Sequence, residues 1–188
     1  MNSQNSPHFN PPIQQTVLRY PDNQHYQLRS ADASFPSTDT TKQDLVAACN
    51  EPFLYDRIFR ERLQGKPYDR DRAEYFLSWA REGWRNNAWF VFAVLSPEGK
   101  IVATIDIKTD QLEGAEIGYW CSEKSTGIMT NTVLALCNIA REAGFRHLYA
   151  RIAPDNARSI GVVSRCNFSP AGLETRNGVQ HLRFNKSL

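Results

Sequence analysis

The sequence predicts an α/β fold, and two features of its pattern indicate it. Residues 116–152 read as a strand, a long amphipathic helix and a second strand. This order makes the two strands parallel neighbours joined by a right-handed crossover. Shorter strand-like runs with turn signals lie on both sides of this segment, and such runs pair as antiparallel hairpins. We therefore expect helices packed on a sheet with both kinds of strand pairing.

The first 50 residues predict a tail, a hairpin and a capped helix. Residues 1–15 are polar and contain two consecutive prolines, so we expect a flexible tail there and a single domain over residues 16–188. The runs 16–20 and 25–30 surround a Pro-Asp-Asn turn and predict the hairpin. A helix within residues 34–50 follows a group of Ser and Thr residues that can cap it.

The middle of the chain alternates helices and strands. Residues 53–63 read as helical, and residues 71–84 place apolar side chains along one helical stripe. The run 89–95 is continuously apolar, as expected of a central strand. Residues 101–107 alternate, so that their apolar side chains share one face, and residues 114–121 form the next strand.

The last third of the chain completes the pattern. Residues 127–143 repeat apolar side chains at helical spacing and end at a glycine. A strand over residues 147–152 precedes a helix that Asp155 or Asn156 can cap. An Asn-Gly pair at 177–178 between two strand-like runs is a strong hairpin signal.

Composition and charge exclude several function classes. The 188 residues are 41% hydrophobic and 22% charged, with a formal net charge of +2. That charge predicts neither a nucleic-acid partner nor an acidic membrane surface. We find no apolar run near the roughly 20 residues of a membrane span, no signal-peptide pattern and no metal-ligand spacing among the cysteines. We expect a cytoplasmic protein, monomeric or homodimeric, without a bound metal.

The loop before the long helix has the composition of an anion site. It reads SEKSTGIMT over residues 122–130. Gly127 has no side chain to obstruct a phosphate, and the first N–H groups of the helix lack partners. Hydroxyl groups and Lys124 add donors. Such a loop suits the pyrophosphate of a nucleotide-type cofactor, although an ordinary capped helix explains the same residues.

The order of several short motifs resembles a known family. The motifs are Glu116 to Trp120, Lys124 to Met129, Gly144-Phe145, Pro154 to Asn156, Ser159 and Asn167-Phe168. In this order they resemble the GNAT N-acetyltransferase superfamily, with the closest likeness to the ribosomal-protein N-terminal acetyltransferases. The resemblance is strong over residues 88–170 and looser over residues 16–87. It implies a mixed, mostly antiparallel sheet with a central parallel pair that splays apart, flanked by helices.

The resemblance also implies an activity, transfer of acetyl from acetyl-CoA to a primary amine by direct attack. The amine belongs to a protein N-terminus or a small molecule. In the splayed gap, backbone groups of residues 119–121 pair with the pantetheine arm, as an added strand pairs with a sheet edge. Asn156 hydrogen-bonds this arm, caps the next helix, or does both. The cofactor residues implied are Tyr119, Trp120, Cys121, Lys124, Ser125, Thr126, Gly127, Ile128, Met129, Asn156 and Ser159.

Three residues depart from the family pattern. Lys124 replaces an Arg or Gln and loses a fork of donors. Met129 replaces a small residue and adds bulk beside the phosphates. Asn167 replaces a Gly before Phe168, and Asn tolerates positive φ.

Carrying the family's roles onto this sequence gives two catalytic candidates. Glu116 matches the position of a general base, which partial burial would favour; its alternative role is a rim carboxylate paired with an Arg. Asp106 is the reserve base. The family's Tyr acid falls at Val163 here, so Ser159 is the candidate partner for the thiolate, with helix capping as its alternative. A backbone N–H near residues 120–121 would stabilise the oxyanion.

Other residues have weaker assignments. A covalent mechanism at Cys121 or Cys166 has no visible His partner. Arg158 and Arg165 either reach the cofactor's 3′-phosphate or lie on solvated helix faces. We expect the acceptor between the first two helices and the C-terminal hairpin, lined or supported by four aromatic residues, of which the first two also suit a core: Trp79, Trp84, Tyr119 and Trp120.

Two rival functions remain on the same fold. One is a small-molecule amine acetylase. The charge of the acceptor site would distinguish it from an enzyme that modifies protein N-termini, because polyamines need clustered carboxylates. The other is a non-catalytic acyl-CoA-binding sensor or interaction module. The missing Tyr acid and the bulk of Met129 favour this second rival.

Overall fold

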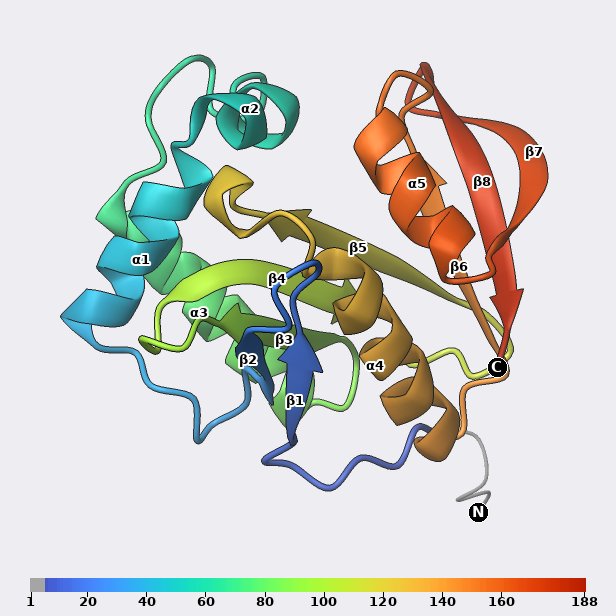
Figure 1. Cartoon of the computed structure of the whole chain (residues 1–188), viewed down its shortest axis with the longest axis horizontal. Coiled ribbons are helices and arrows are strands. Elements are labelled where there is room, and N and C mark those ends of the chain that lie inside the picture. The colour runs from blue at the N-terminus through green and yellow to red at the C-terminus, as the bar shows by residue number, and fades with distance from the viewer. Residues whose placement is uncertain (1–5) are drawn as a thin grey trace.

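The computed structural model describes residues 6–188, so the first five residues of the expected tail lie outside the described part. Eight strands form one mixed sheet in the order β1-β2-β3-β4-β5-β6-β8-β7 (Figure 1). In this sheet β5 and β6 run parallel, and the other neighbours run antiparallel. The predicted fold class, a mostly antiparallel sheet with a central parallel pair and flanking helices, is confirmed.

The strands are β1 (Gln14–Leu18), β2 (His25–Ser30), β3 (Phe90–Leu95), β4 (Ile101–Ile107), β5 (Ala115–Cys121), β6 (His147–Ile152), β7 (Ser169–Arg176) and β8 (Val179–Ser187). The α-helices are α1 (Asp39–Cys49), α2 (Pro52–Leu54), α3 (Arg70–Arg85), α4 (Met129–Glu142) and α5 (Ala157–Arg165). A π-helix, η1 (Tyr55–Phe59), follows α2, and a 3₁₀ turn, η2 (Glu123–Ser125), precedes α4. No helix among residues 6–188 combines the length and apolar character that a membrane crossing requires.

Both predicted hairpins form. β1 and β2 pair with Gln14 opposite Arg29. β7 and β8 meet at a turn in which Asn177 and Gly178 have φ of 52° and 78°, the left-handed values that favour Asn-Gly at this position.

Residues 53–63 differ from the single helix expected. α2 ends after one turn, and the chain widens into η1, where the Arg60 N–H bonds the Tyr55 carbonyl. Of the residues assigned to α2 and η1, only Leu54 is buried. With one buried side chain and Phe59 only partly buried against the core, packing does not impose regular α-helical geometry here.

The N-terminal segment also differs from the expected flexible tail. β1 already begins at Gln14, and the Phe9 ring lies 4.4 Å from the Phe90 ring, centroid to centroid. The backbone N–H of His8 donates to the carbonyl of Ala143 at 2.9 Å. Residues 7–13 therefore pack along the domain. The apolar contact of Phe9 with the core beside β3 holds them there.

β3 is buried on both faces, as the continuous apolar run predicted. Phe90 and Phe92 belong to the core beneath α4, whereas Val91 and Ala93 belong to the core shared with α1 and α3. Figure 1 shows α4 crossing one face of the sheet and α3 behind it. The sheet thus has a helical layer on each side.

The central parallel pair holds together at one end only. β5 pairs with β6 at Ala115 opposite Leu148 and at Glu116 opposite Tyr149. Beyond these positions β5 continues to Cys121 beside β4, and β6 continues to Ile152 beside β8. The expected splay is therefore present, and α5 lies near the separated ends of the strands (Figure 1).

Candidate functional site

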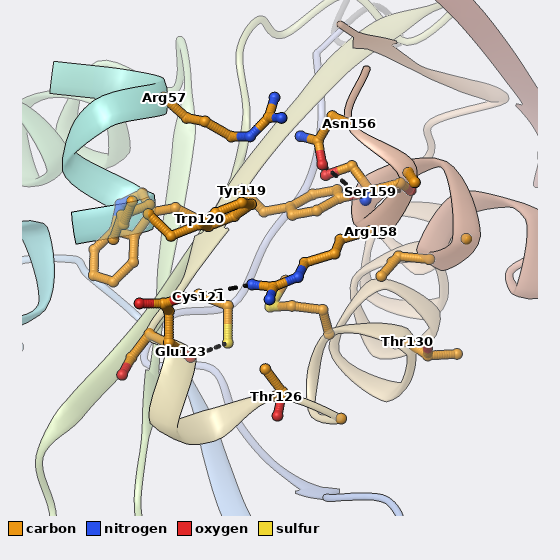
Figure 2. Close-up of a pocket in the computed structure, with 18 of the residues that line it drawn as sticks. Arg57, Tyr119, Trp120, Cys121, Glu123, Thr126, Thr130, Asn156, Arg158 and Ser159 are labelled. Atoms are coloured by element: carbon orange, nitrogen blue, oxygen red, sulfur yellow. Dashed lines mark hydrogen bonds and ion pairs between the residues drawn. The ribbon is translucent and has the colours of Figure 1, made fainter. Parts of the chain in front are cut away.

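A cavity of about 500 Å³ lies where β5 and β6 have separated. The end of β5, the beginnings of α4 and α5, and the segment formed by α2 and η1 all contribute to its wall. Figure 2 shows side chains from these elements converging on it. The expected cofactor residues that line it are Tyr119, Trp120, Cys121, Thr126, Gly127, Met129, Asn156 and Ser159.

The backbone of β5 faces this cavity at alternate residues. The Lys108 N–H donates to the Glu116 carbonyl at 2.9 Å, and the Ser122 N–H donates to the Val102 carbonyl at 2.8 Å. Even-numbered residues of β5 therefore turn their peptide groups toward β4, and odd-numbered residues turn theirs toward the gap. Tyr119 and Cys121 present N–H and C=O groups to the cavity, whereas the peptide groups of Trp120 pair with β4. Of residues 119–121, only the first and last therefore turn peptide groups toward the cavity, where a ligand could pair with them.

The beginning of α4 suits an anion better than that of α5. α4 starts at Met129 with no side-chain cap, so its first N–H groups have no intrahelical partner. Met129 and Thr130 line the cavity at this point. In α5 the Asn156 side chain already accepts the N–H of Ser159 at 3.2 Å. The expected capping role of Asn156 is present, and its amide also lines the cavity.

Gly127 is required for a second reason, beyond the one the sequence suggested. Its φ is 96°, and a Cβ built there would lie 2.0 Å from the carbonyl oxygen of Tyr20. The turn between β1 and β2 therefore packs directly over this residue, and the Tyr20 N–H donates to the Gly127 carbonyl at 3.3 Å. Close backbone packing, in addition to any space for a phosphate, demands a glycine here.

Three expected cofactor residues do not line the cavity. Lys124 is exposed, whereas Ser125 and Ile128 are buried. The cause is η2, which turns the chain before α4 and is anchored from outside the loop. The Glu51 carboxylate accepts the Ser122 hydroxyl at 2.7 Å and the Glu123 N–H at 2.6 Å. Glu51 thus fixes the start of this loop through two of its donors.

Tyr119 reaches across the gap to α5. Its hydroxyl donates to the backbone carbonyl of Ser159 at 3.3 Å, and Figure 2 shows the ring between the two elements. Burial raises the pKa of Tyr119 to about 12. The phenol therefore keeps its proton at neutral pH and can donate it. From the sequence we expected the proton-donating Tyr at the position of Val163 and did not assign that role to Tyr119.

Glu116 lies in a second cavity, of about 700 Å³, rather than in the first. Its carboxylate forms ion pairs with Arg151 and, at 3.5 Å, with Arg176. The side chain is only 13% exposed. The alternative interpretation, a carboxylate paired with an arginine of a neighbouring strand, therefore describes its contact with Arg151 of β6, to which Arg176 of β7 adds a second.

Asp106, the reserve carboxylate, lies opposite Gly118 in the β4–β5 ladder. One oxygen accepts the Gly118 N–H at 3.1 Å and the Lys108 amine at 2.9 Å. Burial raises the pKa of Asp106, although the charge of Lys108 acts against the shift. A raised pKa is a property expected of a general base that works near neutral pH.

Cationic side chains surround the first cavity. The Arg158 guanidinium lies 4.3 Å from the Phe53 ring centroid and 3.7 Å from the Glu123 carboxylate. The Nε of Arg165 donates to the Thr130 hydroxyl at 3.0 Å. Both arginines line the cavity, as does Arg57. Phe53 and Arg57 were not found from the sequence, because their helical segment carries no motif.

The cysteines are not activated nucleophiles. Burial raises the pKa of Cys121 to about 12 and that of Cys166 to about 11. Both side chains are therefore thiols at neutral pH, which disfavours a covalent mechanism. In the part of the chain that the structure describes, no group of three His, Cys, Asp or Glu side chains could hold a metal ion.

The two tryptophans of α3 have structural contacts. The Trp84 indole N–H donates to the Val91 carbonyl at 2.8 Å in the core. Trp79 stacks on Trp89 at 5.5 Å between centroids. Neither lines the two cavities described above, so their core role is the one that the contacts favour.

Comparisons with known proteins agree with this geometry. Residues 38–169 match the family model described as "Acetyltransferase (GNAT) domain". RimJ of Mycobacterium smegmatis, solved in complex with CoA-disulfide, has a TM-score of 0.72 at 18% identity, over 94% of this chain and 88% of that one. A putative ribosomal-protein-serine acetyltransferase from Vibrio cholerae has a TM-score of 0.69 at 17% identity, over 96% and 100%.

A third similar structure is the Microcin C7 self immunity acetyltransferase MccE in complex with acetyl-CoA and AMP. Its TM-score is 0.69 at 16% identity, over 86% of this chain and 92% of that one. At these low identities, it is the TM-scores that establish a shared fold. No curated protein sequence matches the chain.

Proposed function

The chain belongs to the GNAT acetyltransferase family, and from that premise we propose that it transfers acetyl from acetyl-CoA to the primary amine of a protein N-terminus or a small molecule. The observation that carries the proposal is the separation of β5 from β6 beyond Glu116 and Tyr149, over a cavity of about 500 Å³. An open strand edge at the base of such a cavity suits an extended, amide-bearing ligand.

The cofactor follows the wall of this cavity. Its pantetheine arm pairs with the peptide groups of Tyr119 and Cys121, and its pyrophosphate lies at the uncapped beginning of α4 near Met129 and Thr130. Helix N-termini attract anions through their unpaired N–H groups and the helix dipole. Arg158 and Arg165 supply positive charge at the same wall. Asn156 supports the arm from the beginning of α5.

The reaction needs a neutral amine and stabilised charges on oxygen and sulfur. We assign proton acceptance to Glu116, acting through water, because it lines the second cavity at the last pair of β5 with β6. Asp106 is the alternative, favoured by its raised pKa. The Cys121 N–H faces the gap and suits the oxyanion. Ser159 donates to the departing thiolate, together with the hydroxyl of Tyr119.

In direct attack the amine reacts with the thioester without an acetylated enzyme intermediate. The amine nitrogen bonds to the thioester carbon and loses a proton to the base. The carbon–sulfur bond then breaks, and coenzyme A leaves as a thiolate that takes up a proton. We place this reaction in the cytoplasm, in a single domain that acts as a monomer or homodimer and that also includes β1 from Gln14 and the packed segment before it. The four cysteines form no disulfide, in keeping with a reducing compartment.

Two measurements test the proposal. Calorimetry should show one acetyl-CoA bound per chain, and a thiol-release assay with a panel of amines should show turnover. Glu116→Gln and Asp106→Asn then identify the base, since the correct substitution abolishes turnover and leaves acetyl-CoA binding unchanged. Binding without turnover for every amine in wild-type protein would instead support a sensor. The ion pairs that hold Glu116 to Arg151 and Arg176 favour that second function.

A further inference from the structure

The second cavity has an unusual distribution of charge. It lies where β5 and β6 part, and Glu116 of β5, Arg151 of β6 and Arg176 of β7 line it. Its volume of about 700 Å³ is large enough for an amine acceptor. This inference rests on the proposed function, because it assigns the cavity to the acceptor.

Both carboxylates that line this cavity are already occupied. Glu116 lies between Arg151 and Arg176. Glu174 accepts Arg151 at 2.7 Å and Arg183 at 2.6 Å. In Glu174 each oxygen accepts one guanidinium, whereas both arginines of Glu116 contact the same oxygen, Oε2. Two positive charges therefore offset each carboxylate, which weakens its attraction for the ammonium groups of a polyamine.

The most exposed charges of the cavity are positive. The Arg176 side chain is 61% exposed and the Lys108 side chain 40% exposed, whereas Glu116 is 13% exposed. The carboxylate that pairs with Lys108 is Asp106, which is 20% exposed. Gly118 makes room for this pair, because a Cβ there would lie 2.5 Å from the Lys108 amine. Arg176 and Lys108 are therefore more exposed than the carboxylates that line this cavity, of which Glu174, at 30%, is the more exposed.

We propose that the acceptor carries a carboxylate or phosphate close to its reactive amine, and that Arg176 and Lys108 bind this anion. The amine then reaches the thioester at the parting of β5 and β6. A protein N-terminus followed by acidic residues has this chemistry, and so does a small anionic amine. A polyamine or a basic N-terminus is disfavoured because it brings further positive charge to the exposed cations.

Thiol release with matched acceptors tests the proposal. Two peptides of equal length carry the same first residue, followed by Asp and Glu in one and by Lys in the other. Spermidine and free glutamate complete the panel, and glutamate separates a small-molecule source from a peptide source. We expect kcat/KM about tenfold higher for the acidic peptide or for glutamate, since each exposed ion pair contributes a few-fold at most. Added salt should reduce the ratio of kcat/KM values between the acidic and the lysine peptide, because it screens exposed charges.

Charge reversal supplies the control. Arg176→Glu and Lys108→Glu should each abolish the preference, while Arg146→Glu should leave it intact. Arg146 is 70% exposed and pairs with Glu113 away from the cavity. A preference for spermidine or for the lysine peptide overturns the proposal while leaving the acetyltransferase function standing. So does a preference for the acidic acceptors that neither reversal changes.

A binding measurement keeps the two proposals separate. Fluorescence anisotropy of both labelled peptides reports affinity whether or not turnover occurs. Tighter binding of the acidic peptide that is lost in Arg176→Glu supports an anion site even in a protein without turnover. Equal binding of the two peptides overturns it.

Discussion

The hydroxyl of Tyr119 donates a 3.3 Å hydrogen bond to the backbone carbonyl of Ser159, and this bond joins the end of β5 to the first turn of α5. Because β5 and β6 no longer pair at this level, the phenol instead connects β5 to α5 across the cavity. The same bond places a protonated phenol beside the Ser159 side chain, where the departing thiolate is expected.

Tyr119→Phe tests whether this phenol takes part in the reaction. The substitution keeps the ring and removes the proton donor. We expect kcat to fall about tenfold or more, with little change in the KM for acetyl-CoA, because donation to the thiolate matters only as the carbon–sulfur bond breaks. Ser159→Ala is the comparison. Full activity in Tyr119→Phe and a loss in Ser159→Ala would assign donation to the serine alone.

Substitution of Gly127 tests the packing of the β1–β2 turn over the loop before α4. Gly127→Ala should lower the free energy of unfolding by about 2 kcal/mol or more, since its Cβ meets the Tyr20 carbonyl and its φ is 96°. Gly99→Ala is the matched control, with φ of 79° but nothing within 4 Å. Gly99→Ala should lower the free energy of unfolding by about 1 kcal/mol. Equal losses in urea unfolding would contradict the close packing.

Arg158 is the cavity arginine for which we propose a contact with the cofactor phosphates. Its guanidinium pairs with Glu123 at 3.7 Å and lies over Phe53, and Figure 2 shows it extending across the cavity. Arg158→Ala should weaken coenzyme A binding about tenfold, because one charge-assisted contact is lost. Glu123→Gln should strengthen binding by releasing the arginine. Calorimetry with coenzyme A and dephospho-CoA measures both effects. Unchanged affinity in the two variants would remove Arg158 from the site.

Cys121 should react slowly with alkylating reagents, with a defined pH dependence. Its pKa of about 12 leaves a thiolate fraction on the order of one in ten thousand or less near neutral pH. The rate of modification by iodoacetamide should rise about tenfold for each unit of pH below that pKa. Bound coenzyme A should suppress the reaction, because Cys121 lines the cavity. Rapid modification at neutral pH, followed by peptide mass spectrometry, would contradict the burial of this thiol.

The sequence predicts the fold well because its signals are local. The Asn177-Gly178 turn, the continuous apolar run that became β3 and the caps of α1 and α5 depend on neighbours within a few residues. Asn167, which replaces the family's glycine, adopts φ of 59° as its side chain permits. The prediction of a flexible tail was wrong for residues 7–13, because these residues are held by the contact of Phe9 with Phe90, which lies far away in the sequence.

The site is harder to predict because its contacts are long-range. Nothing near Gly127 indicates that Tyr20 packs over it, and nothing near Ser122 indicates that Glu51 binds its hydroxyl. The direction of each peptide group along β5 depends on its register with β4. Motifs therefore located the cavity, whereas tertiary contacts decide which of their residues face it.

Amide hydrogen exchange of β5, with and without acetyl-CoA, tests the central claim most directly. The Gly118 and Trp120 N–H groups pair with β4 and should exchange slowly in both states. The Tyr119 and Cys121 N–H groups face the gap and should become protected when the cofactor binds. This alternating pattern, resolved residue by residue in NMR spectra, is the predicted result. Saturating acetyl-CoA that leaves Tyr119 and Cys121 unprotected would show that the separated strands do not hold the thioester arm.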